Sequence, residues 1–264
     1  MNKILVPVDF SDTSLNALFY AIKLFGQSPV EITVLHIYGA RSTALLMKSI
    51  DNVLERDAKG SMDKLIEKVR KEAPEIVLKT RIVNNYVIPV ITSLGNSGKY
   101  DFIVMGTKGA SGLKEVFIGS VAGGVISKTS APVLIVPAYY SYHPLDEIVF
   151  AISDKPFSNA TVVEPLRKIA TTHNSKVKIL HITEKKTPDI QDALSYIEDL
   201  NLSVTYAFGT GNTNRDLNDY LMKNDIGLLC LIRSKKDFFN RILKDSVTLK
   251  QTFSSPVPLL ILHY

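Results

Sequence analysis

The sequence is poor in cysteine, lacks tryptophan and contains no long apolar segment. Its one cysteine, Cys230, cannot form an internal disulfide, and within the apolar run Ile226–Ile232 it is predicted to be a buried strand residue. No apolar stretch reaches the roughly 18 residues that a membrane span needs, and the N-terminus shows no signal peptide. We therefore expect a cytoplasmic protein with no membrane partner.

A strong excess of charge is also missing. The 264 residues include 31 basic and 26 acidic side chains, which gives a formal net charge of +5. Proteins that bind nucleic acid usually gather Lys and Arg on one face. The densest basic clusters here, Lys68–Lys71 and Lys235–Lys236, are short, and we interpret them as solvated surface. We expect no nucleic-acid partner, whereas the mild positive bias is compatible with a phosphate ligand.

Short apolar runs alternate with helical patterns through the first half. Leu15, Leu18, Ile22 and Phe25 are spaced for one face of a helix, and Ser11–Ser14 offer possible N-caps. Strands that alternate with helices predict a parallel sheet with helices on both faces. The strands are predicted at 4–8, 32–37, 76–83, 102–105 and 133–136, and the helices at 15–25, 41–72, 87–97 and 120–128.

The same order of short motifs recurs in the second half. Ile148–Ile152 corresponds to Ile4–Val8 at an offset of 144, and Ile179–Ile182 matches Val34–Ile37 at an offset of 145. At Leu228–Ile232 the offset is 126, and at Ser255–Val257 it is 124, so the second copy is about 19 residues shorter between its second and fourth strands. We interpret the chain as a duplication followed by divergence.

The duplication predicts two tandem domains, residues 1–138 and 145–264, joined by the linker Ala138–Pro144. Each is expected to be an open, doubly wound α/β domain whose five-stranded parallel sheet is sandwiched by helices. One large sheet formed by the whole chain is the competing interpretation.

A glycine-rich segment, Met105–Val121, leads from the end of a predicted strand to the start of a predicted helix. Ligands of open α/β sheets bind at the carboxyl ends of the strands, and helix N-termini favour phosphate. Gly106, Gly109 and Gly119 would let an anion approach the backbone amides. The Ser120 hydroxyl could donate to a phosphate oxygen, serve as a plain N-cap, or do both.

The spacing matches neither of two common phosphate-binding motifs. No Gly-Lys-Ser/Thr closes the segment, which excludes a Walker A loop, and the glycine spacing differs from the Rossmann pattern. From the residues alone, a phosphate site and a set of simple turns both remain open.

Four motifs together resemble the universal stress protein family. Gly106-x-x-Gly109, followed after nine residues by Gly119-Ser120, is similar to the ATP-binding motif of that family. Val6–Ser11, Val34–Ile37 and Ser130–Pro137 resemble the family in the same order, so that the match covers residues 1–137. With the repeat, the chain resembles a tandem, two-domain member.

The resemblance implies an adenine-nucleotide alpha-hydrolase-like fold that binds ATP, or AMP or ADP, with Mg²⁺ as a further candidate. Asp9 would contact the nucleoside end, with Pro7 beside it as a further implied nucleotide-binding residue, and Ile37 would meet the adenine through its backbone. Met105 and Gly106 would lie beside the ribose and the phosphates. The implied phosphate-binding residues are Gly109, Gly119, Ser120, Val121 and Ala122.

Two positions depart from the family pattern. Asn85-Tyr86-Val87 replaces a Gly-x-Pro turn, and Ala122 stands where a hydroxyl residue can occur. The loss of that hydroxyl removes one phosphate donor, which leaves lower affinity or a preference for AMP or ADP as alternatives.

The second half has lost most of the motif. At the repeat offsets, Asp9 becomes Ser153, and Gly106, Gly109 and Gly119 become Ile232, Lys235 and Asp245, while Ser246 matches Ser120. Asp245 places negative charge where an anion would bind. We expect nucleotide in the first domain only, and interpret Arg233, Lys235 and Lys236 as exposed loop residues rather than as another anion site.

Three classes of function follow from these observations. The first is an ATP-binding protein of stress response or signalling, the second a weak ATPase, and the third an interaction scaffold without nucleotide. No catalytic residues are identified, and His36 and His181 are interpreted as structural. Family members commonly dimerise through their last strands, so Val133–Val136 and Val257–Leu262 could pair as an intramolecular pseudo-dimer, with a further homodimer also possible.

Overall fold

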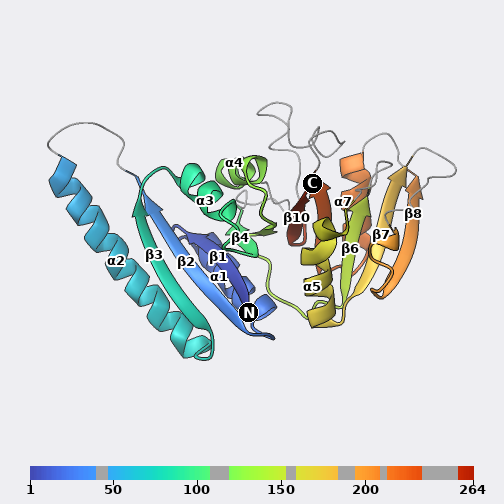
Figure 1. Ribbon diagram of the computed structural model, residues 1–264, viewed down its shortest axis with the longest axis horizontal. Helices are drawn as coiled ribbons and strands as arrows, with labels where there is room; N and C mark the ends of the chain where they lie inside the picture. The colour runs from blue at the N-terminus through green and yellow to red at the C-terminus, as the bar shows by residue number, and fades with distance from the viewer. Residues whose placement is uncertain (40–46, 108–118, 153–158, 184–193, 209–212, 234–254) are drawn as a thin grey trace.

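A computed structural model describes residues 1–39, 47–107, 119–152, 159–183, 194–208, 213–233 and 255–264. Its strands form one ten-stranded sheet in the order β3-β2-β1-β4-β5-β10-β9-β6-β7-β8 (Figure 1). The strands are β1 Asn2–Val8, β2 Val30–Tyr38, β3 Val77–Asn84, β4 Phe102–Gly106, β5 Val133–Val136, β6 Glu147–Ile152, β7 Lys176–Thr183, β8 Leu202–Phe208, β9 Leu228–Arg233 and β10 Leu259–His263.

Each half of the chain contributes five parallel strands in the same spatial order, which confirms the predicted α/β fold and its internal repeat. The halves meet where β5 and β10 pair antiparallel, with Leu134 opposite Leu260. The two interpretations of the sequence therefore combine, because two repeats of one fold share a continuous sheet. In Figure 1, β3 and β8 form the outer edges, and α2 lies along β3.

Helices cover both faces of the sheet. They are α1 Asp12–Phe25, α2 Met47–Glu72, α3 Val87–Gly95, α4 Ser120–Lys128, α5 Glu164–His173 and α7 Thr213–Lys223, with a 3₁₀ turn at Ala160–Val163. The predicted bounds of α4 and β5 are confirmed. No residue ranges were predicted from the sequence for α5, α7 and β8. None of the helices in the described ranges is long and apolar enough to span a membrane.

Two hydrophobic cores, one on each face of the sheet, run across the boundary between the halves. Along β6, Ile148 and Phe150 join the core that includes α1, α2 and α5, and Val149 and Ala151 join the core under α3, α4 and α7. Alternation along each strand sends successive side chains to opposite faces. Cys230 is fully buried in the first of these cores, as predicted.

The predicted linker is held in place by contacts to α1. Asn16 donates from its side-chain amide to the carbonyl oxygens of Pro137 and Tyr140, at 3.1 and 3.2 Å. The ring of Tyr20 meets those of Tyr140 and Tyr142 edge-on, with centroids 6.0 and 5.6 Å apart. These ring contacts, with Tyr20 buried and Tyr140 and Tyr142 partly buried, restrict the path of the chain between the repeats.

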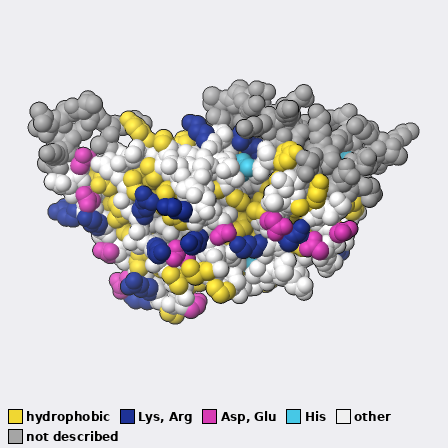
Figure 2. Space-filling model, viewed as in Figure 1, with side chains coloured by type: hydrophobic (Ala, Val, Ile, Leu, Met, Phe, Trp, Pro, Cys, Tyr) yellow, Lys and Arg dark blue, Asp and Glu magenta, His cyan; other side chains and the backbone are white. Residues whose placement is uncertain are grey.

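Side-chain contacts also join the two halves away from the shared strands. Lys168 Nζ lies 3.1 Å from Asp101 Oδ1, and His173 Nε2 lies 2.8 Å from the carbonyl oxygen of Leu24 at the end of α1. The surface around such contacts mixes both charge signs. On the face drawn in Figure 2, Lys and Arg side chains are interspersed with Asp and Glu.

We expect the two halves to unfold together. Leu260→Ala removes a fully buried side chain opposite Leu134, so the free energy of unfolding should fall by about 2–5 kcal/mol in one cooperative transition. Urea denaturation, followed by both tyrosine fluorescence and circular dichroism, measures this loss. Leu54→Ala, at a side chain that is 39% exposed, is the control and should change little. Two separate transitions in the wild type would contradict the shared core.

Candidate functional site

Those predicted site residues that the structure describes lie around the point where the strand order of the first half reverses. The chain proceeds from β1 outward through β2 to β3, and then returns to place β4 on the other side of β1. Ligands of open α/β sheets bind at such a switch point, beyond the carboxyl ends of the strands. Asp9 follows β1, Gly106 ends β4, and α4 begins at Ser120 after the glycine-rich segment.

The turn between β1 and α1 has an unusual backbone conformation. Phe10 has φ +63°, in the left-handed region that residues other than glycine rarely adopt. Its ring packs on His36, with centroids 4.4 Å apart, and His36 Nδ1 lies 2.9 Å from the Val8 carbonyl oxygen. These contacts give His36 a structural role and retain the strained turn. No feature of the sequence indicates the left-handed conformation of Phe10.

Asp9 is exposed and anchored by serines. Burial of part of the carboxyl group raises its pKa, but hydrogen bonds from Ser11 and Ser14 outweigh this, and the pKa of Asp9 lies below its ordinary value. The Ser11 amide donates to Asp9 Oδ1 at 3.1 Å, and the Asp9 amide donates to Ser14 Oγ at 3.3 Å. Ser11 is also the N-cap of α1, so the carboxylate is held ionised at the start of a helix.

Gly106 is needed for packing. A Cβ atom at this position would lie 2.5 Å from the carbonyl oxygen of Thr13 and 2.8 Å from Thr13 Cγ2. The close approach of β4 to the first turn of α1 therefore requires glycine, in addition to any room that a ligand needs. Thr107, the next residue, is buried, and its amide donates to the Val136 carbonyl at 3.1 Å.

Gly119 differs from Gly106 because no atom of the described residues lies close to the position of its missing side chain. A Cβ atom there would meet no described atom within 4 Å. Gly119 is the N-cap of α4, with no side-chain cap among the described residues, so the interpretation of Ser120 as N-cap is wrong. Ser120 is the first helical residue because the extended backbone, with ψ 163°, is at Gly119, and the Ser120 side chain is exposed.

The first turn of α4 presents backbone rather than side chains. The amides of Ser120, Val121 and Ala122 precede the first helical bond, which Gly123 donates to Gly119. Val121 is 38% exposed, whereas the Ala122 methyl is buried in the core. At position 122 the chain therefore offers a phosphate only its backbone amide.

The remaining predicted residues lie in or beside the neighbouring strands. Pro7 is half-buried on β1, Ile37 half-buried near the end of β2, and Met105 buried on β4. Asn85, in the turn that departs from the family pattern, donates its amide to the Tyr38 carbonyl at 3.0 Å. Gly109 lies outside the described residues, so its place is untested.

The second half has a different arrangement at the corresponding strand ends. Ile232 occupies the place of Gly106 on β9, as the repeat predicts, while Ser153, Lys235, Lys236, Asp245 and Ser246 lie outside the described residues. The interpretation of Arg233 as an exposed loop residue is wrong. Arg233 ends β9, is partly buried, and donates from Nη1 to the Ile126 carbonyl at the last turn of α4, at 3.1 Å.

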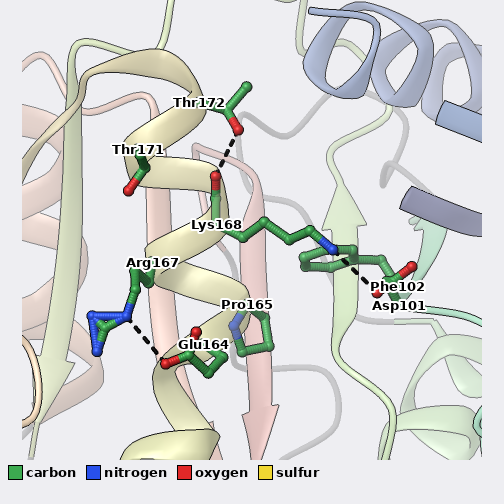
Figure 3. Close-up of a pocket in the computed structure, with 8 residues that line it drawn as sticks. All are labelled: Asp101, Phe102, Glu164, Pro165, Arg167, Lys168, Thr171 and Thr172. Atoms are coloured by element: carbon green, nitrogen blue, oxygen red, sulfur yellow. Dashed lines mark hydrogen bonds and ion pairs between the residues drawn. The ribbon is translucent and has the colours of Figure 1, made fainter. Parts of the chain in front are cut away.

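A groove of about 520 Å³ lies elsewhere, at the amino end of β4 (Figure 3). It is lined by Asp101 and Phe102 and by one side of α5. Lys168 pairs with Asp101 across the groove, and Arg167 is held 3.1 Å from Glu164 Oε1. Because carboxylates already neutralise both cations, the groove offers no excess charge to an anion, and we assign no ligand to it.

The two glycines should respond differently to substitution. Gly106→Ala forces a side chain against the Thr13 backbone and should lower the free energy of unfolding by about 1–3 kcal/mol. Gly119→Ser places a favourable N-cap residue where no described atom lies close and should change it by less than about 0.5 kcal/mol. Chemical denaturation of both variants measures the difference. Equal losses would show that Gly106 is not closely packed.

Stability should also depend on His263, which is mostly buried beside Arg233 at the end of β10. Burial, aided by the Arg233 charge, lowers the pKa of His263 from 6.5 to about 4. The unfolded chain therefore binds a proton before the folded one, so stability is lost as pH falls from 6.5 towards 4, by up to about 3 kcal/mol. Denaturation at pH 7 and pH 4.5 should show a smaller difference for His263→Gln. An unchanged pH dependence would rule out this contribution.

Comparison with known proteins agrees with the fold and the motifs. The family model described as universal stress protein family matches residues 1–137. Universal stress protein MJ0577 of Methanocaldococcus jannaschii is 31% identical over 155 residues, which cover 51% of this chain and 93% of that protein. Universal stress protein YxiE of Bacillus subtilis is 29% identical over 147 residues, covering 51% of this chain and 98% of its own length.

One solved structure is similar over nearly the whole chain. A universal stress protein from Archaeoglobus fulgidus has a TM-score of 0.75 at 22% identity, and the match covers 98% of this chain and 97% of that one. At this identity the likeness establishes the fold of both halves.

Proposed function

The chain belongs to the universal stress protein family, and on this premise we propose that it binds one adenine nucleotide, held by the first domain only. The ligand is ATP, with ADP and AMP as alternatives, and the protein acts in stress response or signalling in the cytoplasm. The domain bounds proposed are 1–138 and 145–264.

The observation that carries this proposal is the N-terminus of α4 at the switch point of the first half, where no described atom lies close to the missing side chain of Gly119. Gly119 caps the helix without a side chain, and the amides of the first turn are free of helical bonds. Such a terminus favours a phosphate group. Asp9 and the end of β4 lie at the same edge of the sheet, which suits a ligand that extends from its phosphates towards a nucleoside.

The exposed hydroxyl of Ser120 would donate to a phosphate oxygen beside these amides, and Gly109 is proposed to contribute a further amide. Mg²⁺ remains a candidate companion of the nucleotide. Within the described ranges, no group of three or more His, Cys, Asp or Glu side chains is placed to hold a metal ion.

The pairing of β5 with β10 supports a second part of the proposal. Within one chain, the two last strands make the kind of antiparallel contact that would join two subunits. We propose that the second domain acts as a built-in partner of the first, in an intramolecular pseudo-dimer. Further self-association into a homodimer would then use other surfaces.

Calorimetric titration with ATP, ADP and AMP tests the proposal. We expect one site per chain, after denatured protein has been checked by mass spectrometry for nucleotide carried through purification. Gly119→Val adds a side chain at the helix start and should weaken binding by about 10-fold or more, because charged hydrogen bonds to the phosphates are lost. Gly60→Val, in the exposed middle of α2 and with no described atom near its Cβ position, is the matched control.

Each alternative has its own outcome in this experiment. Two sites per chain would show that the second domain also binds nucleotide. No binding and no carried-over nucleotide would leave an interaction scaffold. Rapid release of phosphate from ATP would show that the protein is an ATPase rather than a nucleotide-binding protein without turnover.

A further inference from the structure

The hydrogen-bonded ladder at the switch point ends earlier in the first domain than in the second. β1 and β4 pair only at Ile4 with Phe102 and at Leu5 with Ile103. β6 and β9 form these two pairs at the equivalent positions and continue through Phe150 and Ala151 to Leu231. At the repeat offsets of 144 and 126, Ala151 is the counterpart of Pro7.

The chemistry of proline explains where the first ladder stops. Lys3 turns its backbone towards β4, since its amide donates to the Asp101 carboxylate at 2.7 Å and its carbonyl accepts from the Asp101 amide at 2.8 Å. Alternate residues of a strand face the same neighbour, so Leu5 and Pro7 also face β4. The next two ladder pairs both need an N–H at position 7, and proline has none.

The second domain supplies the missing donor. The Glu147 carbonyl accepts from the Gly227 amide at 3.0 Å, which corresponds to the contact between Lys3 and Asp101 and shows that the two ladders have the same register. Ala151 carries the N–H that Pro7 lacks, and the two pairs that depend on it are formed. One residue therefore accounts for the difference.

The unpaired stretch lies where the ligand is proposed to bind. β1 remains paired to β2 as far as Val8, and β4 remains paired to β5 as far as Gly106, so each strand end is held only from its outer side. Asp9 follows the first of these ends. In the second domain the corresponding ends of β6 and β9 are paired with each other.

We propose that Pro7 is a positioning residue that keeps the ends of β1 and β4 uncoupled, so that the crevice between them can admit the nucleotide. This inference rests on the proposed function. Pro7 would act through the backbone it leaves unpaired, and not as the direct ligand contact that the family resemblance implied. Ala151 would close the same crevice in the second domain. The second domain would then lack nucleotide binding for two reasons, the paired strand ends and the missing glycines.

The test compares Pro7→Ala with two controls in the full chain. The variant gains an amide at position 7, which should donate to the Val104 carbonyl and be protected from hydrogen exchange in NMR of labelled protein. ATP affinity measured by calorimetry should fall roughly 10-fold, because opening the crevice must now break ladder hydrogen bonds. Ala151→Pro, which opens the second ladder, and Pro29→Ala, at an exposed proline outside the site, should leave ATP affinity unchanged.

Each result decides the inference. Protection of the new amide together with weaker binding supports it. An unprotected amide would show that something other than proline ends the ladder, and a protected amide with unchanged affinity would leave Pro7 a purely structural residue. A wild-type protein that binds no nucleotide would refute the proposed function first, and the role of Pro7 towards the ligand with it. If Pro29→Ala also weakened ATP binding, the loss of affinity in Pro7→Ala would reflect a general loss of chain stiffness, and the inference would be wrong.

Discussion

The antiparallel pairing of β5 with β10 is the contact on which the rest of the molecule depends. It converts two five-stranded sheets into one and aligns their faces, so that each hydrophobic core continues from one repeat to the other. A last strand with no neighbour would expose a row of backbone donors and acceptors. The duplication resolves this within a single chain, and contacts such as that of Arg233 with the end of α4 reinforce the same boundary.

Gly106 and Gly119 belong to one sequence motif but have different physical roles. Gly106 allows β4 to approach the backbone of α1, whereas at Gly119 no described atom lies near the missing side chain. A sequence motif records only that both positions lack a side chain. The distinction matters for mutagenesis, because loss of binding after a change at Gly106 would also reflect damage to the fold. Gly119 gives the cleaner report on a ligand.

The two domains differ through their backbone as well as through their side chains. The glycines of the first half are replaced by residues with side chains, and the ladder between β1 and β4 stops before Pro7, whereas the ladder between β6 and β9 includes Ala151. Meanwhile Arg233 contributes to the boundary between repeats. The second copy thus retains the architecture, while the end of β9, through Arg233, contacts the first half instead of a ligand.

The sequence by itself determined the order of strands and helices in the first half, the repeat and the family, because apolar periodicity and glycine spacing are local properties of the chain. It predicted α4 and β5 to the residue, and it brought Asp9, Gly106 and Ser120 to one edge of a sheet through the rule that governs parallel strands. Only the tertiary structure decided that the repeats share one sheet, that Gly119 rather than Ser120 caps α4, that Phe10 adopts a left-handed turn, and that Arg233 is partly buried at the boundary. These features depend on which distant segments come into contact, and that is set by packing between the halves rather than by the residues on either side of each position.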